Sequence, residues 1–258
     1  MHERNINLLD CTLRDGGYYN NWKFNKNLIN DYLKVISDYV DYIEIGFRFL
    51  DKDSSLGETA YTKSSFLKSI KIPKNVKLGV MINASDLIFY GNRNISKVIK
   101  KIFPQKDPKI KFVRIACHSF EVEKILPAIQ ILKKNYVIIV NIMQISELSE
   151  NIIKKVCKLL KNKISCLYIA DSLGSLTSKQ VIHKNNKIRK YWHGDLGMHA
   201  HDNMKNALDN TLTAVKLGFN WADGTILGMG RGAGNAKIED LIKKIKKSKT
   251  TNIDKLIS

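Results

Sequence analysis

The sequence predicts a single (β/α)8 TIM barrel of the α/β class, and three observations support this prediction. The chain has 258 residues, of which 44% are hydrophobic and 26% charged, which suffices for one large buried core. Short apolar segments rich in β-branched residues recur along it, and segments with helical spacing separate them. Most of the apolar segments are continuous runs, as expected for parallel strands buried on both faces.

The expected strands follow one another from the start of the chain to its last quarter. They are Ile6–Cys11, Tyr42–Phe47, Lys77–Ile82, Phe112–Cys117, Tyr136–Met143, Ser165–Ala170, Gly197–Ala200 and Trp221–Leu227. Helical spacing marks stretches between them, among them Leu28–Val40, Ile95–Phe103, Glu121–Lys134 and Asn151–Lys161. Eightfold alternation within about 250 residues favours a closed barrel. The alternative, a doubly wound open sheet, needs a switch point and usually has fewer strands.

The chain has room for one domain only. After the eighth expected strand, one helix and a short polar segment complete the sequence. We therefore expect a catalytic barrel at residues 1–242 and a basic, polar tail at residues 243–258, where lysines are dense. No internal repeat and no stretch rich in Pro, Gly and Ser divides the barrel.

Cysteine usage and the N-terminal residues predict a cytoplasmic protein. The four cysteines form no C-x-x-C pair and lie mainly in apolar segments. We expect reduced, buried thiols rather than a disulfide framework or a zinc knuckle. The first ten residues lack a signal-peptide apolar region, and no apolar run approaches the roughly 20 residues of a membrane span. We therefore expect no membrane association.

The net charge of +19 does not by itself indicate nucleic-acid binding. Of the 43 basic residues only seven are arginine, and the lysines are scattered over the expected helices. Nucleic-acid-binding surfaces tend to cluster arginine and aromatic residues along one face. We therefore expect no nucleic-acid partner, and a small anionic substrate is the better match for the positive field.

Two chemically distinctive segments follow the first and the seventh expected strands. The first is Thr12-Leu-Arg-Asp15-Gly, and the second contains His199-Ala-His201-Asp-Asn. Residues i and i+2 of a strand point to the same side, so His199 and His201 project together. The first and seventh strands lie near each other in a closed barrel, so Asp15 can complete a set of three metal ligands. A lone H-x-H pair is equally explained by hydrogen-bonded surface histidines, but the strand-end position and the acid-rich first turn favour metal.

Further candidates end the second and fourth strands, on the barrel face where active sites form. His118 directly follows the fourth strand and can act in acid–base catalysis or cap the following helix. Glu44 lies in or near the barrel mouth on the second strand, and Arg48 lies just beyond it. A buried acid is costly unless it is paired, and Arg14 is the available cation, so we expect an Arg14–Glu44 ion pair alongside any catalytic role.

The loops after the sixth and eighth strands also reach this face. Asp171 follows the sixth strand and begins a polar loop. The segment Gly228–Ala236 reads GMGRGAGNA, and barrels commonly hold a phosphate or carboxylate at such a loop. Gly230 and Arg231 are therefore candidate substrate contacts, with Arg231 as a clamp. The same glycines are equally suited to a tight turn.

Taken together, four motifs resemble those of the metal-dependent lyase superfamily called DRE-TIM metallolyases. They are TLRDG after the first strand, a Glu on the second, HAHDN at the seventh and G-x-G-x-GAGNA after the eighth. The superfamily includes 4-hydroxy-2-oxovalerate aldolase, hydroxymethylglutaryl-CoA lyase and isopropylmalate synthase. The similarity runs from about Asn5 to Asp240 and is greatest to the pyruvate-type aldolases, because TLRDGG and GMGRGAGNA occur together.

The resemblance implies a metal site and a reaction. Asp15, His199 and His201 would bind a divalent cation, Mn²⁺ or Mg²⁺, and Arg14 would stabilise the enolate oxygen beside it. Asn235 matches a position that ligates metal in the lyase and synthase branches, but not clearly in the aldolases. The implied activity is cleavage or formation of a 4-hydroxy-2-oxo acid through a pyruvate enolate, with a sugar-derived acid as one expected substrate. Related barrels commonly pair up, which implies a homodimer.

The sequence departs from the aldolases at the expected catalytic base. Those aldolases carry a histidine after RDG, whereas this chain has Tyr18 and Tyr19 there. The base is then Tyr18, His118, a metal-bound water, or absent. Two other functions remain open on the sequence: an acyl-CoA-using Claisen lyase or synthase of the same superfamily, and a catalytically altered metal-binding barrel that acts as a partner protein.

Overall fold

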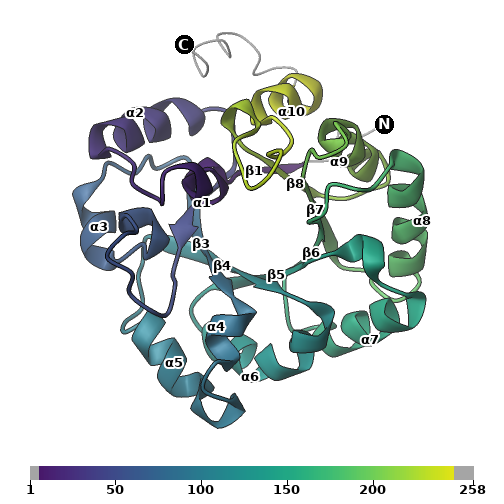
Figure 1. Ribbon diagram of the computed structural model, residues 1–258, viewed down its shortest axis with the longest axis horizontal. Helices are drawn as coiled ribbons and strands as arrows, with labels where there is room; N and C mark the ends of the chain where they lie inside the picture. Colours follow the sequence, from purple (N-terminus) through teal and green to yellow (C-terminus); the bar gives the residue numbers. More distant parts are fainter. Residues whose placement is uncertain (1–5, 247–258) are drawn as a thin grey trace.

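The structure, a computed structural model, describes residues 6–246. Its strands are β1 (Asn7–Asp10), β2 (Tyr42–Phe47), β3 (Lys77–Asn83), β4 (Ile110–Cys117), β5 (Val137–Ile142), β6 (Cys166–Asp171), β7 (Asp195–Ala200) and β8 (Trp221–Gly224). They form one closed parallel barrel in sequence order, surrounded by helices (Figure 1). The closure is made by β8, which pairs with β1 from Asn7↔Trp221 to Asp10↔Gly224. The predicted (β/α)8 barrel is therefore confirmed, and the open sheet is excluded.

Ten α-helices are found within residues 6–246. They are α1 (Thr12–Asp15), α2 (Lys26–Ile36), α3 (Ser64–Ser69), α4 (Ala84–Ile88), α5 (Ile95–Ile102), α6 (Val122–Leu132), α7 (Glu150–Leu160), α8 (Ser178–Arg189), α9 (Ala207–Lys216) and α10 (Ile238–Ile245). In the part of the chain that the structure describes, no helix is both long enough and apolar enough to cross a membrane.

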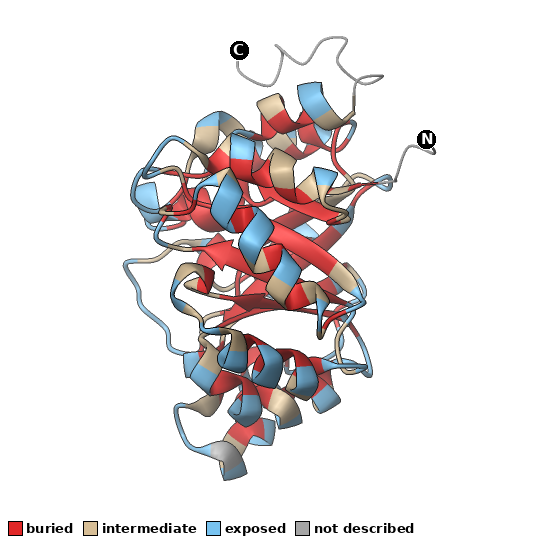
Figure 2. Ribbon diagram, turned by 90° about the vertical axis from the view of Figure 1, so that its right-hand side faces the viewer, coloured by how far each residue is buried: buried red, intermediate tan, exposed pale blue. Residues whose placement is uncertain are grey.

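The core has an outer layer and an inner layer, both built by the alternation of side chains along each strand. Residues such as Leu8 and Val113 point outward and pack beneath the helices. Leu9, Phe112 and Tyr168 point inward and fill the barrel. Figure 2 shows the strands buried almost throughout, while the helices expose their outer faces. This inner apolar cluster fills part of the barrel interior, while Asp15 and His201 follow the carboxyl-terminal ends of β1 and β7.

The observed elements differ from the expected ones mainly at their ends. The eighth strand was expected to reach Leu227 but ends at Gly224, because a 3₁₀ turn at Ile226–Gly228 places Leu227 at a φ of 54°. The expected basic tail begins inside α10, which continues to Ile245, and residues 247–258 lie outside the described residues. All four cysteines are free and buried, as predicted.

Candidate active site

The candidate site lies at the carboxyl-terminal end of the barrel, where β1, β8 and β7 are neighbours. Asp15, His199 and His201 are all buried there, and one ligand atom from each lies within 4.8 Å of the others. The structure therefore brings together the three residues that the strand-end argument selected.

The short helix α1 carries two of the predicted site residues, and Asp10 fixes its start. The carboxylate of Asp10 accepts the backbone N–H of Thr12 at 2.8 Å and the Thr12 hydroxyl at 3.0 Å. The Tyr32 hydroxyl donates to the same carboxylate. Thr12 Oγ1 in turn accepts the backbone N–H of Ile226, which ties the turn after β1 to the loop after β8. Burial raises the pKa of Asp10 to about 6, and its contacts identify it as a structural residue.

The glycine pair of the motif allows a tryptophan to lock this turn. A Cβ on Gly17 would lie 2.1 Å from Cδ1 of Trp22, so only glycine permits this packing. Trp22 Nε1 donates to the backbone carbonyl of Arg14 at 2.7 Å. The Trp22 ring also contacts Tyr18 and Phe47 edge to face, with centroid distances of 4.8 and 5.7 Å. Trp22 thus holds the turn that carries Arg14, both by this hydrogen bond and by the packing of its ring.

His199 on β7 and His201 directly after it face the same side, and Asp223 orients His199. The rings of His199 and His201 lie with their centroids 5.0 Å apart. His199 Nδ1 lies 2.9 Å from a carboxylate oxygen of Asp223, while Nε2 lies 3.8 Å from Asp15. A carboxylate at Nδ1 favours the tautomer with its proton there, which leaves the Nε2 lone pair facing Asp15.

The glycine-rich loop after β8 folds back on itself and delivers Asn235 to the site. The backbone of Asn235 forms a bridge with His201 and donates to the Gly228 carbonyl at 2.9 Å. Gly228 and Gly234 have φ angles of 71° and 87°, and a Cβ on Gly234 would lie 2.0 Å from the Gly228 carbonyl oxygen. Of the two explanations for these glycines, the structure therefore supports the tight turn.

The amide of Asn235 joins the buried acid of the site. Its Nδ2 donates to Asp15 Oδ2 and, at 3.2 Å, to the carbonyl of Met229. Its Oδ1 is buried and has no hydrogen-bond partner within the described chain. Gly230 packs directly against these two side chains. A Cβ on it would lie 2.9 Å from Asp15 Oδ2 and 2.2 Å from Asn235 Nδ2, so a larger residue would collide with them.

The protonation states suit a metal site. Burial lowers the pKa of His201 to about 4, so its imidazole is neutral at pH 7. Burial alone would raise the pKa of Asp15, but Arg14 and the two histidines outweigh it and lower the pKa. The site thus offers an ionised carboxylate and an uncharged imidazole, as metal ligation requires.

Arg14 donates in two directions and keeps a third donor free. Its Nη1 lies 2.7 Å from Asp15, and its Nε lies 2.7 Å from Glu44, so the expected Arg14–Glu44 ion pair is present. Its Nη2 is buried and has no partner among residues 6–246. Burial lowers the pKa of Arg14, but the two carboxylates outweigh it and raise the pKa, so the guanidinium stays charged. A buried, unpaired N–H is costly unless a ligand satisfies it.

Sequence reasoning missed two charged residues and one amide that face the barrel interior. Arg114 binds Glu44 through two hydrogen bonds, of 2.9 and 2.6 Å, and binds Asp223 at 2.5 Å. Asn141 on β5 is buried, and its Oδ1 lacks a partner in the described part of the chain. An arginine within the apolar run FVRIAC, and an acid in WADG, were the signals that could have found the charged pair, since buried charges need partners.

The donor set fits a hard divalent cation. It combines a carboxylate and two imidazoles with the unpartnered amide oxygen of Asn235. Three of the buried carboxylates, those of Asp15, Glu44 and Asp223, contact two buried guanidiniums, those of Arg14 and Arg114. This connected group thus contains one more carboxylate than guanidiniums, and its Asp15 carboxylate belongs to the ligand group.

A second group of ligand-type residues is less suited to binding a divalent cation. Cys11, His199 and Asp223 also place ligand atoms within 4.8 Å of one another. However, burial raises the pKa of the Cys11 thiol well above its usual value, and the thiol donates to the Gly224 carbonyl at 3.3 Å. Asp223 is already held by Arg114, so this group has no free ligand set.

The two acid–base candidates differ in their surroundings. Tyr18 lies at the rim, 46% exposed, where burial raises its pKa and the charges of Arg14 and Asp15 act on it. His118 is half-buried at the end of β4, on the expected face. Its ring stacks on Phe120 at 5.2 Å, and its backbone N–H donates to Glu121 at 2.7 Å. Of the two candidates, Tyr18 is thus the one on whose pKa Arg14 and Asp15 act.

Arg48, expected to bind substrate, is engaged elsewhere. It is buried, donates to the Thr62 carbonyl at 3.2 Å and pairs with Asp107 at 3.5 Å. Its guanidinium lies 4.5 Å from the ring centroid of Phe103, which belongs to the outer core. The structure does not bring Arg48 to the metal ligands, and we do not assign it to the substrate.

The remaining candidates organise the loops around the mouth. The carboxylate of Asp171 accepts the backbone N–H groups of Ser175 and Leu176 at 3.1 and 3.0 Å and thereby holds the loop after β6. Burial raises its pKa. The exposed Arg231 donates to the carbonyl of Ser172 at 3.2 Å, which links the loops after β6 and β8 beside the ligands.

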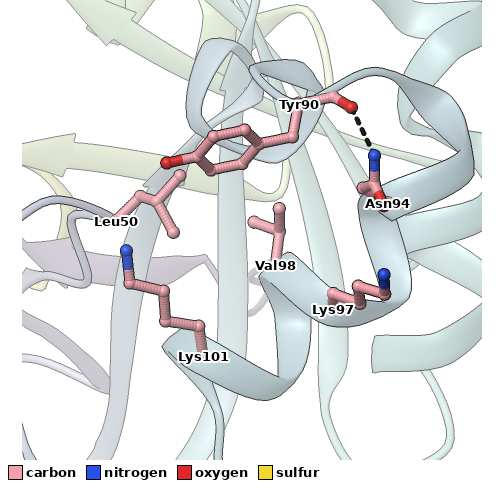
Figure 3. Close-up of a pocket in the computed structure, with 6 residues that line it drawn as sticks. All are labelled: Leu50, Tyr90, Asn94, Lys97, Val98 and Lys101. Carbon is pink, nitrogen blue, oxygen red and sulfur yellow. Dashed lines mark hydrogen bonds between the residues drawn. The ribbon is translucent and has the colours of Figure 1, made fainter.

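A surface pocket beside α5 is separate from this site (Figure 3). Its lining residues are Leu50, Tyr90, Asn94, Lys97, Val98 and Lys101. Figure 3 shows the Asn94 amide directed toward the Tyr90 carbonyl, to which it donates at 2.7 Å. No carboxylate or imidazole occurs among these described lining residues, so the pocket does not offer a second metal site.

Comparison with known proteins agrees with this geometry. Residues 5–256 match the model of the HMGL-like family. The oxaloacetate decarboxylase of Mycobacterium tuberculosis is 24% identical over 243 residues, which cover 91% of this chain and 68% of that protein. The 4-hydroxy-2-oxovalerate aldolase of Pelotomaculum thermopropionicum is 27% identical over 250 residues, covering 94% and 70%.

A solved structure extends the comparison to three dimensions. The N-terminal domain of a candidate aldolase from Bacteroides vulgatus superposes with a TM-score of 0.84 at 30% identity, covering 97% of this chain and 85% of that one. These matches confirm the expected class, a metal-dependent carbon–carbon lyase. With a family model that spans nearly its whole length, the chain belongs to the HMGL-like family of DRE-TIM metallolyases.

Proposed function

We propose that this protein is an aldolase that cleaves or forms 4-hydroxy-2-oxo acids through a pyruvate enolate. One observation carries the proposal: the unpartnered Nη2 of Arg14 lies beside the ligand group of Asp15, His199 and His201. The names of two relatives support the 2-oxo acid half of the substrate, because oxaloacetate and 4-hydroxy-2-oxovalerate are both 2-oxo acids.

We assign the cation to Asp15, His199 and His201, with the Asn235 amide oxygen as a further ligand. Oxygen and nitrogen donors of this kind support Mn²⁺ or Mg²⁺. A bound divalent cation supplies Lewis-acid polarisation of the ketone oxygen. Gly230 and Arg231 border the same space, and we assign the substrate carboxylate to their side of the mouth.

Arg14 is the group that we assign to the developing negative charge. When the bond between C3 and C4 breaks, its electron pair becomes the enolate, and the hydroxyl proton on C4 passes to solvent water so that an aldehyde forms. Arg14 Nη2 donates to the oxygen on which that charge gathers. Because Asp15 and Glu44 already hold the guanidinium, little reorganisation accompanies the step.

The test is pyruvate release from a panel of 2-oxo acids, measured by coupled reduction with lactate dehydrogenase. The panel contains 4-hydroxy-2-oxovalerate, oxaloacetate and polyhydroxylated, sugar-derived 4-hydroxy-2-oxo acids. We expect release by the protein loaded with Mn²⁺ or Mg²⁺, loss after chelation, and recovery when either ion is restored. Metal-independent release, or no release from any 4-hydroxy-2-oxo acid, would contradict the proposal. Free thiol released from acetyl-CoA would favour the Claisen alternative.

Replacing Tyr18 with phenylalanine is expected to lower kcat for pyruvate release about 100-fold, the lower end for loss of an acid–base group. The raised pKa keeps Tyr18 protonated at neutral pH, so we assign it as the proton donor to the enolate carbon. The neighbouring Tyr19, which is 64% exposed, provides the matched control Tyr19→Phe. A larger loss in His118→Ala than in Tyr18→Phe would transfer this role to His118.

We also propose a cytoplasmic location and a homodimer. Four buried, free thiols support a reducing compartment. Equilibrium sedimentation of the full chain tests the homodimer, and a monomer at micromolar concentration would overturn it.

A further inference from the structure

We propose that Arg114 is a positioning residue that sets the metal affinity through His199 and the substrate affinity through Arg14. This inference rests on the proposed function and deepens it, because it names the group that links the two halves of the site. Arg114 is fully buried and lies on β4, across the barrel from the metal ligands of β7.

One arm of Arg114 leads to the metal ligands. Its Nη1 donates to Asp223 Oδ2 at 2.5 Å, and the other oxygen of the same carboxylate lies 2.9 Å from His199 Nδ1. Arg114 therefore fixes the orientation of the carboxylate that aims His199 Nε2 at Asp15.

The other arm leads to the enolate-binding group. Arg114 holds both oxygens of Glu44, at 2.9 and 2.6 Å, and Glu44 Oε2 also accepts Arg14 Nε at 2.7 Å. With Glu44 held in this way, Arg14 donates from Nε to Glu44 and from Nη1 to Asp15, while its Nη2 has no partner among residues 6–246.

The two arms meet again at Asp15, so the contacts form a closed ring. Arg14 Nη1 lies 2.7 Å from Asp15 Oδ1, and His199 Nε2 lies 3.8 Å from Asp15 Oδ2. Three carboxylates alternate around the ring with two guanidiniums and the imidazole of His199, and each carboxylate contacts two neighbours in it. A shift of Arg114 would therefore displace both the metal ligand and the enolate donor.

Lysine cannot replace Arg114 in this position. A guanidinium presents donors in a fixed fork that can serve two carboxylates at once, whereas an ammonium is a point charge on a flexible stem. The Arg114 guanidinium also lies 4.8 Å from the ring centroid of Tyr168, which closes the space beneath it. Arg114→Lys keeps the charge but loses this simultaneous contact to Glu44 and Asp223.

The experiment is calorimetric titration of the full chain with Mn²⁺ alone, followed by titration of the Mn²⁺-loaded protein with oxalate. We expect Arg114→Lys to weaken Mn²⁺ binding roughly tenfold, within the range for lost outer partners of metal ligands. We expect weaker oxalate binding as well. The matched control is Arg189→Lys, because Arg189 donates to the carbonyls of Gly194 and Gly218 at the opposite end of the barrel.

The titrations separate positioning from structural support. If Arg114 only stabilises the fold, Arg114→Lys lowers the number of binding sites per chain and the melting temperature, while both dissociation constants stay at the wild-type values. That result would overturn the inference. If Arg114→Lys does not fold, two other variants test the inference, because each alters only one of the two carboxylates that Arg114 binds. Asp223→Asn should weaken Mn²⁺ binding more than oxalate binding. Glu44→Gln should weaken oxalate binding more than Mn²⁺ binding. If both variants weaken the two affinities equally, the inference is overturned.

The same measurements distinguish this inference from the proposed function, because neither titration requires turnover. A wild-type protein that binds Mn²⁺ but releases no pyruvate would contradict the aldolase, while the titrations would still decide the role of Arg114. A wild-type protein that releases pyruvate, with unchanged affinities in Arg114→Lys, would overturn only the role of Arg114.

Discussion

Replacing Arg14 with lysine is expected to lower kcat for pyruvate release roughly 100- to 1,000-fold, the loss that follows removal of one donor to a developing oxyanion. Arg14 holds Asp15 and Glu44 with two of its donor positions, and Nη2, which we propose contacts the substrate, has no partner among residues 6–246. Lysine retains the positive charge, but its three N–H donors leave a single nitrogen and cannot reproduce the fixed spread of Nε, Nη1 and Nη2. The loss should therefore fall on the chemical step.

The measurement is steady-state kinetics with 4-hydroxy-2-oxovalerate, together with Mn²⁺ titration of the same variant. We expect kcat to fall far more than Mn²⁺ affinity, because Asp15, His199 and His201 all remain. The control Arg189→Lys should keep the wild-type kcat. An Arg14→Lys variant with wild-type kcat would show that the enolate charge is stabilised without Arg14.

Replacing His199 with alanine is expected to abolish metal-dependent turnover. The variant removes one of the three assigned ligands and leaves the Asp223 carboxylate without its imidazole partner. Loss of an outer partner alone costs about 10- to 100-fold in metal affinity, and loss of a ligand should cost more. Mn²⁺ titration and pyruvate release together measure the effect.

The control for this variant is His183→Ala, because His183 lies exposed on α8. It should retain the wild-type turnover and Mn²⁺ affinity. A His199→Ala variant with full turnover would contradict the assigned metal site, and high Mn²⁺ concentrations that restore its turnover would support it.

The barrel could be predicted because its signals are local. Parallel strands buried on both faces are continuous apolar runs, and eight such runs separated by helical segments favour a closed barrel over an open sheet. The ligand group could be predicted for a related reason: His199 and His201 are two positions apart at the end of one strand, and a closed barrel brings the end of β1 close to them.

The role of Arg48 could not be predicted, because a local irregularity changes the side to which it points. Strict alternation from Glu44 would direct Arg48 inward, but the pairing of β2 with β3 shifts between Glu44 and Phe47. A Cβ on Gly46 would lie 2.0 Å from the Thr59 carbonyl oxygen, so this close backbone approach depends on glycine. Phe47 packs in the apolar cluster at the mouth, and Arg48 instead binds Asp107.

The sequence by itself determined the barrel, the carboxyl-terminal face as the place of the site, and the three residues that converge there. Only the tertiary structure decided what holds them. Arg114 stands 70 residues from Glu44 and 109 from Asp223, and no spacing rule relates them. Strand register determines which inward side chains meet across a closed barrel, and the cost of leaving a buried charge unpaired then selects the partners.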